Sequence, residues 1–166
     1  MEKKGNSSKE NSRYIPEGAH TITPYLVVDG ASEFIDFAKK VFKAEVTNNT
    51  KADDGKVINA NLNIGDSSLM VSDLMEGMKV ENTMLYIYVK DVDATYEKAI
   101  DAGAKNLDKV KDQFYGDRAG AITDAWGNKW WIATHKEDLS DSELEKRARQ
   151  QLTKDMSKSK RETVDA

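Results

Sequence analysis

The stretch Phe114–His135, FYGDRAGAITDAWGNKWWIATH, contains the pattern that decides the fold. Ala119–Thr123 and Lys129–Thr134 are β-prone, and the turn-forming residues AWGN lie between them. The pattern predicts two strands joined by a tight turn. Because adjacent residues of a strand point to opposite faces, one of Trp130 and Trp131 faces each side of the sheet. A strand with a tryptophan on both faces is expected in the middle of a sheet.

Composition narrows the class of protein. The chain has 166 residues, of which 39% are hydrophobic, enough for one domain with tails or for two small fused halves. Its formal net charge of −4 argues against nucleic acid as the main partner, because such binding needs a concentrated basic surface. It has no cysteine, and no run approaches the roughly 18 apolar residues of a membrane span. We expect a cytoplasmic protein with no nucleic acid or membrane partner.

The first half of the chain alternates strand and helix signals. Residues 1–18 are polar and are expected to form a disordered leader. The helix is predicted over Ala31–Phe42, where apolar residues recur on one helical face. The strands are predicted over residues 21–28, 44–49, 57–64 and 68–72. Residues 19–74 therefore read as strand, helix and three strands.

The second half repeats this order. A helix is predicted over residues 91–103, and strands over 84–89, 107–113, 120–123 and 129–134. Adding 61 to the positions of Tyr25, Ala38 and Met70 gives Tyr86, Ala99 and Trp131. We therefore predict an α+β fold of two tandem βαβββ modules, about residues 19–74 and 83–136.

A charged segment, residues 137–166, follows the second module. Ser140 and Glu143 fit a helix capping box. An apolar stripe comes next, formed by Leu144, Ala148, Leu152 and Met156. We expect a C-terminal helix of about three to four turns, with disorder from about residue 157. It either packs on its own domain or forms an arm that crosses to a second subunit.

Three segments resemble the vicinal oxygen chelate superfamily, which includes glyoxalase I, extradiol dioxygenases and bleomycin-resistance proteins. They are PYLVVDGASEFIDFAKKVFKAE, LMVSD and DQFYGDRAGAITDAWGNKWWIATH. The resemblance spans about residues 19–135 and is closest to the PhnB-like branch. It implies curved sheets with helices on their convex sides, a cleft enclosed by the concave sides, and in many members a homodimer.

The resemblance also implies where a metal would bind. Active members hold one divalent ion with His, Gln or Glu from the first and last strand of each module. The corresponding positions here are Thr23, Met70, Met84 and Trp131. None suits a hard or borderline cation, and thioethers beside a tryptophan more often fill an apolar gap. We therefore expect no metal at these positions and no cofactor.

Strand parity selects candidate residues for the cleft. Tyr25, Met84, Tyr86, Tyr88 and Trp131 share the face of the presumed ligand positions. They either line an aromatic pocket for a planar or hydrophobic small molecule or fill the cleft as core.

Polar candidates lie nearby in the sequence. Tyr115 and Arg118 are expected to meet the polar end of a ligand, since arginine offers paired donors to carboxylate or phosphonate groups. The alternative is a structural pair between Arg118 and an aspartate. Asn61, with Asn59 and Asn63, forms either a hydrogen-bonding wall of the cleft or a solvated face.

These residues favour a metal-free small-molecule-binding protein whose ligand is unknown. One alternative is a lyase, isomerase or dioxygenase-type enzyme with a displaced divalent metal. For this, only His20 and His135 are available as histidine ligands or bases, and both lie at strand ends outside the family's site. The other alternative is a structural or interaction protein with a filled cleft.

Overall fold

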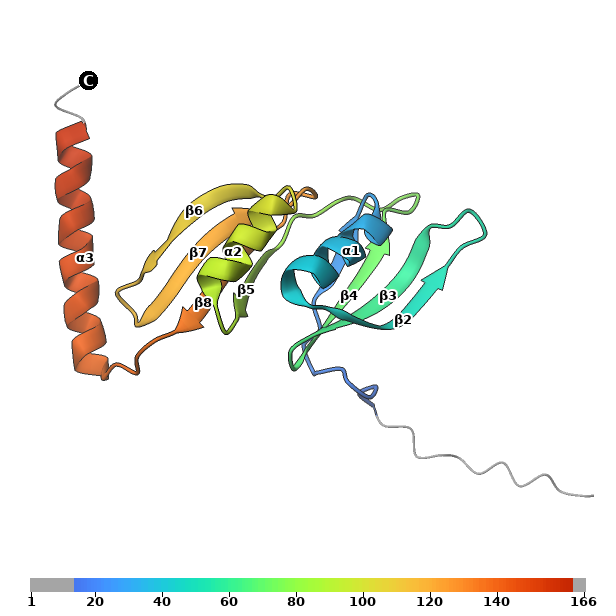
Figure 1. Ribbon diagram of the computed structural model, residues 1–166, viewed down its shortest axis with the longest axis horizontal. Helices are drawn as coiled ribbons and strands as arrows, with labels where there is room; N and C mark the ends of the chain where they lie inside the picture. The colour runs from blue at the N-terminus through green and yellow to red at the C-terminus, as the bar shows by residue number, and fades with distance from the viewer. Residues whose placement is uncertain (1–13, 163–166) are drawn as a thin grey trace, which may run out of the picture.

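The computed structural model, which describes residues 14–162, contains two four-stranded sheets, each with its own helix (Figure 1). The first module comprises β1 (Tyr25–Val28), α1 (Ala31–Phe42), β2 (Glu45–Lys51), β3 (Val57–Ile64) and β4 (Ser67–Asp73). The second comprises β5 (Met84–Tyr88), α2 (Val92–Asp101), β6 (Lys105–Asp112), β7 (Asp117–Thr123) and β8 (Lys129–His135). Helix α3 (Asp141–Glu162) follows. The predicted α+β fold of two βαβββ modules is confirmed.

The two sheets have the same topology. Their strand orders are β1-β4-β3-β2 and β5-β8-β7-β6, with the first and last strands of each module parallel. Tyr25 pairs with Met70, and Tyr86 pairs with Trp131 at positions 61 residues further along. The repeat detected in the sequence is thus a repeat of strand register. Strand β8 lies between β5 and β7, as its two tryptophans predicted.

Each module joins its last strand to the start of its helix. The backbone N–H of Ala31 donates to Asp73 Oδ1 at 2.8 Å, and that of Val92 donates to Thr134 Oγ1 at 2.9 Å. These two bonds again differ by 61 residues. They satisfy N–H groups that the first turn of a helix leaves without partners.

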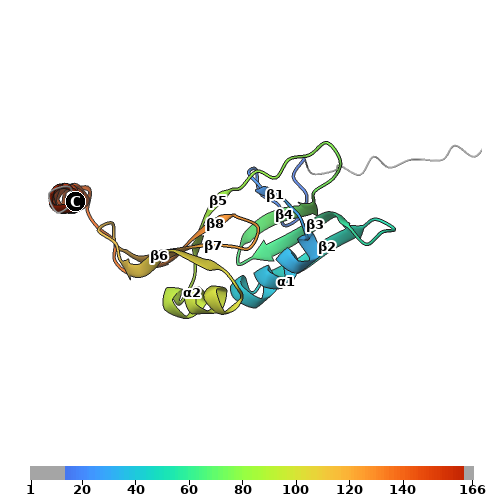
Figure 2. The ribbon, with the colours of Figure 1, turned by 90° about the horizontal axis from the view of Figure 1, so that it is seen from above.

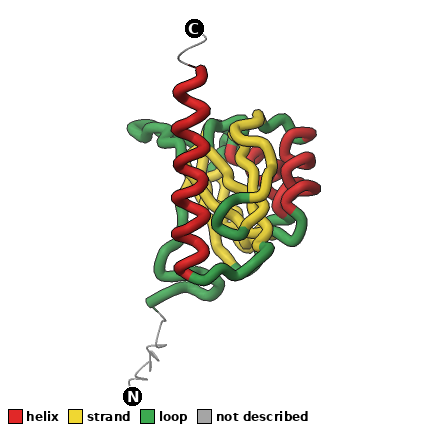
Figure 3. The backbone as a smooth tube through the Cα atoms, turned by 90° about the vertical axis from the view of Figure 1, so that its left-hand side faces the viewer, coloured by secondary structure: helices red, strands yellow, loops and turns green. Residues whose placement is uncertain are grey.

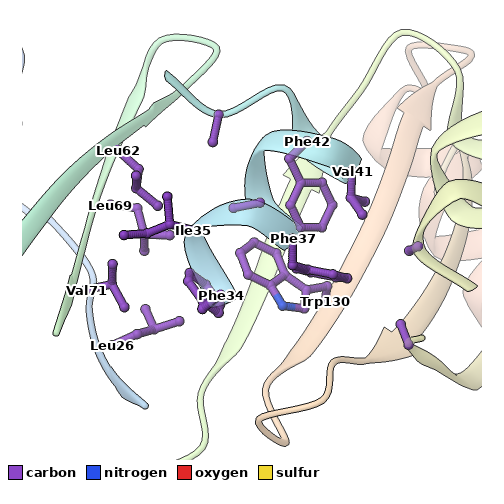
Figure 4. Close-up of a cluster of buried hydrophobic side chains, with 14 of the residues drawn as sticks. Leu26, Phe34, Ile35, Phe37, Val41, Phe42, Leu62, Leu69, Val71 and Trp130 are labelled. Atoms are coloured by element: carbon purple, nitrogen blue, oxygen red, sulfur yellow. The ribbon is translucent and has the colours of Figure 1, made fainter. Parts of the chain in front are cut away.

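The modules share one hydrophobic core, and Trp130 lies at their junction (Figure 4). Its side chain is 2% exposed and packs against Phe34 and Phe42, with ring centroids 6.5 and 4.5 Å away. Trp126 of the same hairpin contacts Phe34 and Phe37. Trp130 therefore packs beneath a helix. The helix is α1 of the other module, which joins the two modules through buried aromatic rings.

Both module helices lie on the same side of the molecule, and the strands lie on the other (Figure 2). Contacts join α1 to α2, so the helix-covered sides meet between the modules. The opposite faces of the two sheets stay open, with Tyr25 48% and Met84 67% exposed. The described part of a single chain therefore does not enclose the cleft expected between these faces.

Helix α3 is longer than the sequence predicted, because it continues to Glu162. Ser140 Oγ accepts the Glu143 N–H, as the capping box required, and pairs such as Glu143–Arg147 and Glu145–Arg149 join successive turns. Figures 1 and 2 show α3 standing apart from both modules rather than packed on them, and Figure 3 shows its straight, uninterrupted course. The predicted leader lies outside the described residues apart from residues 14–18.

Among the described residues, no helix is long and apolar enough to cross a lipid bilayer.

Candidate functional site

The open face of the second sheet carries a group of aromatic side chains. Tyr86 and Tyr88 of β5 are 46% and 63% exposed, and their ring centroids lie 5.2 Å apart. Trp131 of β8 is the register partner of Tyr86 and is partly buried on the same face. Met84 precedes them on this face, so the strands place together four of the residues selected by parity.

A buried carboxylate lies at one end of this face, where β7 begins and β8 ends. Asp117 is the first residue of β7 and pairs with His135 at the end of β8. Its Oδ2 accepts hydrogen bonds from the Tyr86 and Tyr88 hydroxyls, each at 3.0 Å. Its Oδ1 lies 2.7 Å from His135 Nδ1, and its side chain is only 3% exposed. Three strands thus converge on one carboxylate.

Two further groups extend this network. The Tyr115 hydroxyl lies 3.4 Å from that of Tyr86, and His135 Nε2 lies 3.1 Å from Asp138 Oδ1. We call Tyr86, Tyr88, Tyr115, Asp117 and His135 the Asp117 cluster. Both ring nitrogens of His135 therefore contact a carboxylate.

The cluster shifts the protonation equilibria of its members. Burial raises the pKa of Asp117, but hydrogen bonds from His135, Tyr86 and Tyr88 outweigh it and hold the pKa below its ordinary value. The bonds to Asp117 and then Asp138 raise the pKa of His135. Burial, followed by bonds to Tyr115 and Asp117, raises the pKa of Tyr86. These directions favour the ionised form of Asp117, the protonated form of His135 and the neutral forms of Tyr86 and Tyr88.

Arg118 lies on the other side of the sheet. It follows Asp117 in the same strand and so points to the opposite face. Its guanidinium binds Asp93 of α2 through two hydrogen bonds of 2.8 and 2.7 Å, and Asp112 through one of 3.2 Å. These bonds match the alternative of a structural Arg–Asp pair. Arg118 does not join the aromatic residues, contrary to its expected place at a cleft mouth.

The first sheet carries a corresponding open face that is more polar. Tyr25, Met70 and Asn61 form one row across β1, β4 and β3. The Tyr25 hydroxyl donates to Ser72 Oγ at 2.8 Å. The side-chain oxygens of Asn59 and Asn61 are buried and have no hydrogen-bond partner in the described part of the chain. Tyr25 and Asn61 therefore share a face, but in a different module from the Asp117 cluster.

The positions that correspond to the family's metal ligands do not form a donor set for a hard cation. Thr23 precedes β1, and its hydroxyl donates to the backbone oxygen of His20. Met70, Met84 and Trp131 supply two thioethers and an indole, whereas hard divalent cations take oxygen or nitrogen ligands. Within the part of the chain that the structure describes, no group of three or more His, Asp or Glu side chains could hold a metal ion.

The architecture defines a class: a paired βαβββ protein with aromatic, hydrogen-bonding residues on its open sheet faces. The family model of the Glyoxalase/Bleomycin resistance protein/Dioxygenase superfamily matches residues 19–132, and the chain belongs to this superfamily.

Two mycobacterial proteins are similar to this chain in sequence. An uncharacterized protein of Mycobacterium tuberculosis strain H37Rv is 32% identical over 135 residues, covering 75% of this chain and 79% of the relative. A second, from Mycobacterium bovis, is 32% identical over 135 residues, with 75% of this chain and 89% of the relative covered.

Solved structures share the fold. TioX from Micromonospora sp. ML1 has a TM-score of 0.60 and 20% identity, with 70% of this chain and 99% of that chain covered. A PhnB protein from Bacillus cereus also has a TM-score of 0.60, at 19% identity, with 69% and 99% covered. At these identities the likeness concerns the fold alone.

The sequence analysis did not identify Asp117 as a site residue, and it treated His135 as lying outside the family's site. The predicted strand covered residues 120–123, whereas β7 begins at Asp117. Had the strand been extended to that residue, parity would have placed Asp117 on the face of Ala119 and Ala121, opposite His135.

Proposed function

We propose that this chain is a small-molecule-binding protein that works without a metal, within the PhnB-like branch of its superfamily. The observation that carries the proposal is the exposed aromatic face around the Asp117 cluster. Soluble proteins rarely leave several large aromatic side chains exposed together without a partner. A flat apolar ligand stacked on Tyr86, Tyr88 and Trp131 would be removed from water on one side. The Asp117 cluster would orient the ligand by hydrogen bonds to the ligand's polar groups.

The metal-free part of the proposal rests on donor chemistry. Methionine, tryptophan and threonine occupy the family's ligand positions, and none of them suits a hard divalent ion. The enzyme alternative has little support from His135, because both of its ring nitrogens already contact carboxylates. A protonated imidazole held in this way is not available as a general base. The alternative of a cleft filled by its own side chains conflicts with the exposure of Tyr86 and Tyr88.

Calorimetric titration with a neutral aromatic alcohol, 2-naphthalenemethanol, tests binding at this face. We expect saturable binding that Tyr88→Ala weakens at least tenfold. The matched control is Leu107→Ala, because Leu107 is also exposed but lies on β6 at the opposite edge of the sheet. Equal affinities of the two variants would contradict the proposed site. A stoichiometric divalent ion found by elemental analysis of purified protein would contradict the metal-free part.

We also propose that the protein is a homodimer in which the two copies of α3 pair in an antiparallel arrangement. Leu152 and Met156 of the predicted apolar stripe are 63% and 64% exposed, so residues 14–162 leave this part of the stripe uncovered. Charge favours a second copy as the partner. Acidic residues gather at positions 137–145 and basic residues at 154–161, so an antiparallel pair brings opposite charges together.

Sedimentation velocity of the full chain tests this assembly. Leu152→Glu should raise the dimer dissociation constant at least tenfold, because it places a charge in the apolar stripe. Gln150→Glu, which changes an exposed residue outside the stripe by the same charge, should leave it within twofold. A wild-type monomer, or a dimer unaffected by Leu152→Glu, would rule out pairing through α3.

A further inference from the structure

We infer that the ligand of the open face presents hydrogen-bond donors, and that a cationic amine or guanidinium on a flat apolar body binds better than the matching carboxylate. The inference deepens the proposed function and rests on it. The hydrogen-bond donors of the Asp117 cluster already have partners within the protein.

The hydroxyl protons of the tyrosines in the Asp117 cluster are already donated in hydrogen bonds within the protein. Each phenol has one proton to donate and can also accept hydrogen bonds. Tyr86 and Tyr88 both donate to Asp117 Oδ2, which as a carboxylate oxygen can only accept. At 3.4 Å, Tyr115 can then interact with Tyr86 only by donating to its oxygen. The hydroxyl oxygens that remain available to a ligand are therefore acceptors.

His135 does not supply a free donor either. Its Nδ1 faces Asp117 Oδ1 at 2.7 Å, and its Nε2 faces Asp138 Oδ1 at 3.1 Å. A protonated imidazole has only these two N–H groups, and each has a carboxylate partner. A ligand carboxylate placed here would face only acceptor oxygens and would find no hydrogen-bond donor. An ammonium or amide N–H could instead donate to these oxygens.

The local charge also favours a cationic ligand over an anionic one. One imidazolium stands between two carboxylates, Asp117 and Asp138, so this part of the face is net negative. Arg118, the cation expected to receive an anionic ligand, binds Asp93 and Asp112 on the other face. Exposed tyrosine rings also attract cations placed over their faces.

The lysines that the strand register places on this side of the sheet do not change that balance. Lys111 is bound to Asp108 at 2.9 Å. Lys129 begins β8 six residues before His135, and Lys105 pairs with Thr123 six residues after Asp117, so each lies about 20 Å along a strand from the cluster. None of the three stands beside the Asp117 cluster as a free positive charge for a ligand carboxylate.

The first sheet supports the same chemistry independently. Tyr25 uses its proton on Ser72, so its oxygen is also left as an acceptor. Asn59 Oδ1 and Asn61 Oδ1 are buried acceptors without a partner in the described part of the chain. A buried acceptor without a partner is costly, and a donor from a ligand would satisfy it. The open faces of both modules thus present acceptor oxygens that hydrogen-bond donors of a ligand would satisfy.

Three probes with one ring system test the inference: 2-naphthylmethylammonium, 2-naphthalenemethanol and 2-naphthoate. Titrated calorimetrically into the full chain at pH 7, the ammonium should bind about 10-fold or more tightly than the carboxylate, as expected for charge-assisted hydrogen bonds. The alcohol should lie between them. Asp117→Asn removes the charge and frees tyrosine protons, so the preference should fall to less than about threefold.

Asp112→Asn is the matched control, because Asp112 binds Arg118 on the helix-covered side and its loss should leave the order of the probes unchanged. If Asp117→Asn does not fold, the double variant Tyr86→Phe and Tyr88→Phe removes the hydroxyl oxygens that would accept from the ligand and should also reduce the ammonium preference. A carboxylate that binds as well as the ammonium would overturn the donor inference and leave the binding function intact. No binding of any probe would overturn both.

Discussion

The junction between the modules predicts very different roles for two adjacent tryptophans. Trp130 is buried against Phe34 and Phe42, and its Nε1 donates to Asp124 Oδ2 at 2.9 Å. Trp131 lies partly exposed on the open face. The matched substitutions Trp130→Phe and Trp131→Phe remove the same atoms from the two environments.

The expected magnitudes follow from these contacts. Loss of a hydrogen bond to a charged group costs about 1.5–3 kcal/mol. The smaller ring leaves a void of roughly 40 Å³, which adds about 1 kcal/mol at the usual cost of a core cavity. Trp130→Phe should therefore lower the free energy of unfolding by about 2.5–4 kcal/mol. Trp131→Phe, on a partly exposed face, should lower it by less than about 1 kcal/mol.

Urea denaturation followed by far-ultraviolet circular dichroism measures both changes without relying on the fluorescence of the replaced residue. For a chain of this size, the loss at Trp130 corresponds to a fall of about 5–15 °C in melting temperature. The wild type should unfold in one transition, because buried aromatic contacts join the modules. Equal losses in the two variants, or a larger loss at Trp131, would refute the assignment of Trp130 to the junction.

Three other perturbations test separate parts of the structure. The pKa of His135 is raised above 6.5 in the folded state, so its stabilising contribution is complete below that pH and is lost as pH rises through the folded pKa. Chemical denaturation from pH 6 to 9 should show this loss in the wild type and in His20→Gln, but not in His135→Gln. A methyl group on Gly120 would lie 2.9 Å from the backbone nitrogen of Val110, so Gly120→Ala should cost about 1–3 kcal/mol by denaturation, and an unchanged midpoint would contradict that close approach. Arg118→Gln should leave the affinity for 2-naphthalenemethanol within twofold, and a tenfold loss would return Arg118 to the binding site.

Local sequence patterns predicted the elements well where propensity and periodicity agreed. Ala31–Phe42 and Val57–Ile64 have the predicted bounds, and Asp91 caps α2 by accepting the Ala94 N–H. The observed ends differ from the predicted ones where strand pairing, rather than propensity, decides the state. Strand β7 begins at Asp117 because its backbone pairs with β8 as far as His135. This pairing with β8 extends β7 to Asp117 and Arg118 and thereby decides which face of the sheet each of the two side chains occupies.

The sequence by itself determined the duplicated modules, the central position of β8 and the aromatic character of one sheet face, because these follow from periodicity, parity and a repeat of 61 residues. Only the tertiary structure decided which module covers Trp130, which side of the sheet Arg118 occupies, and how three strands converge on Asp117. These features depend on packing between segments far apart in the chain. The physical reason is that periodicity gives the direction of a side chain within its own strand, whereas its partners depend on how the strands and helices assemble.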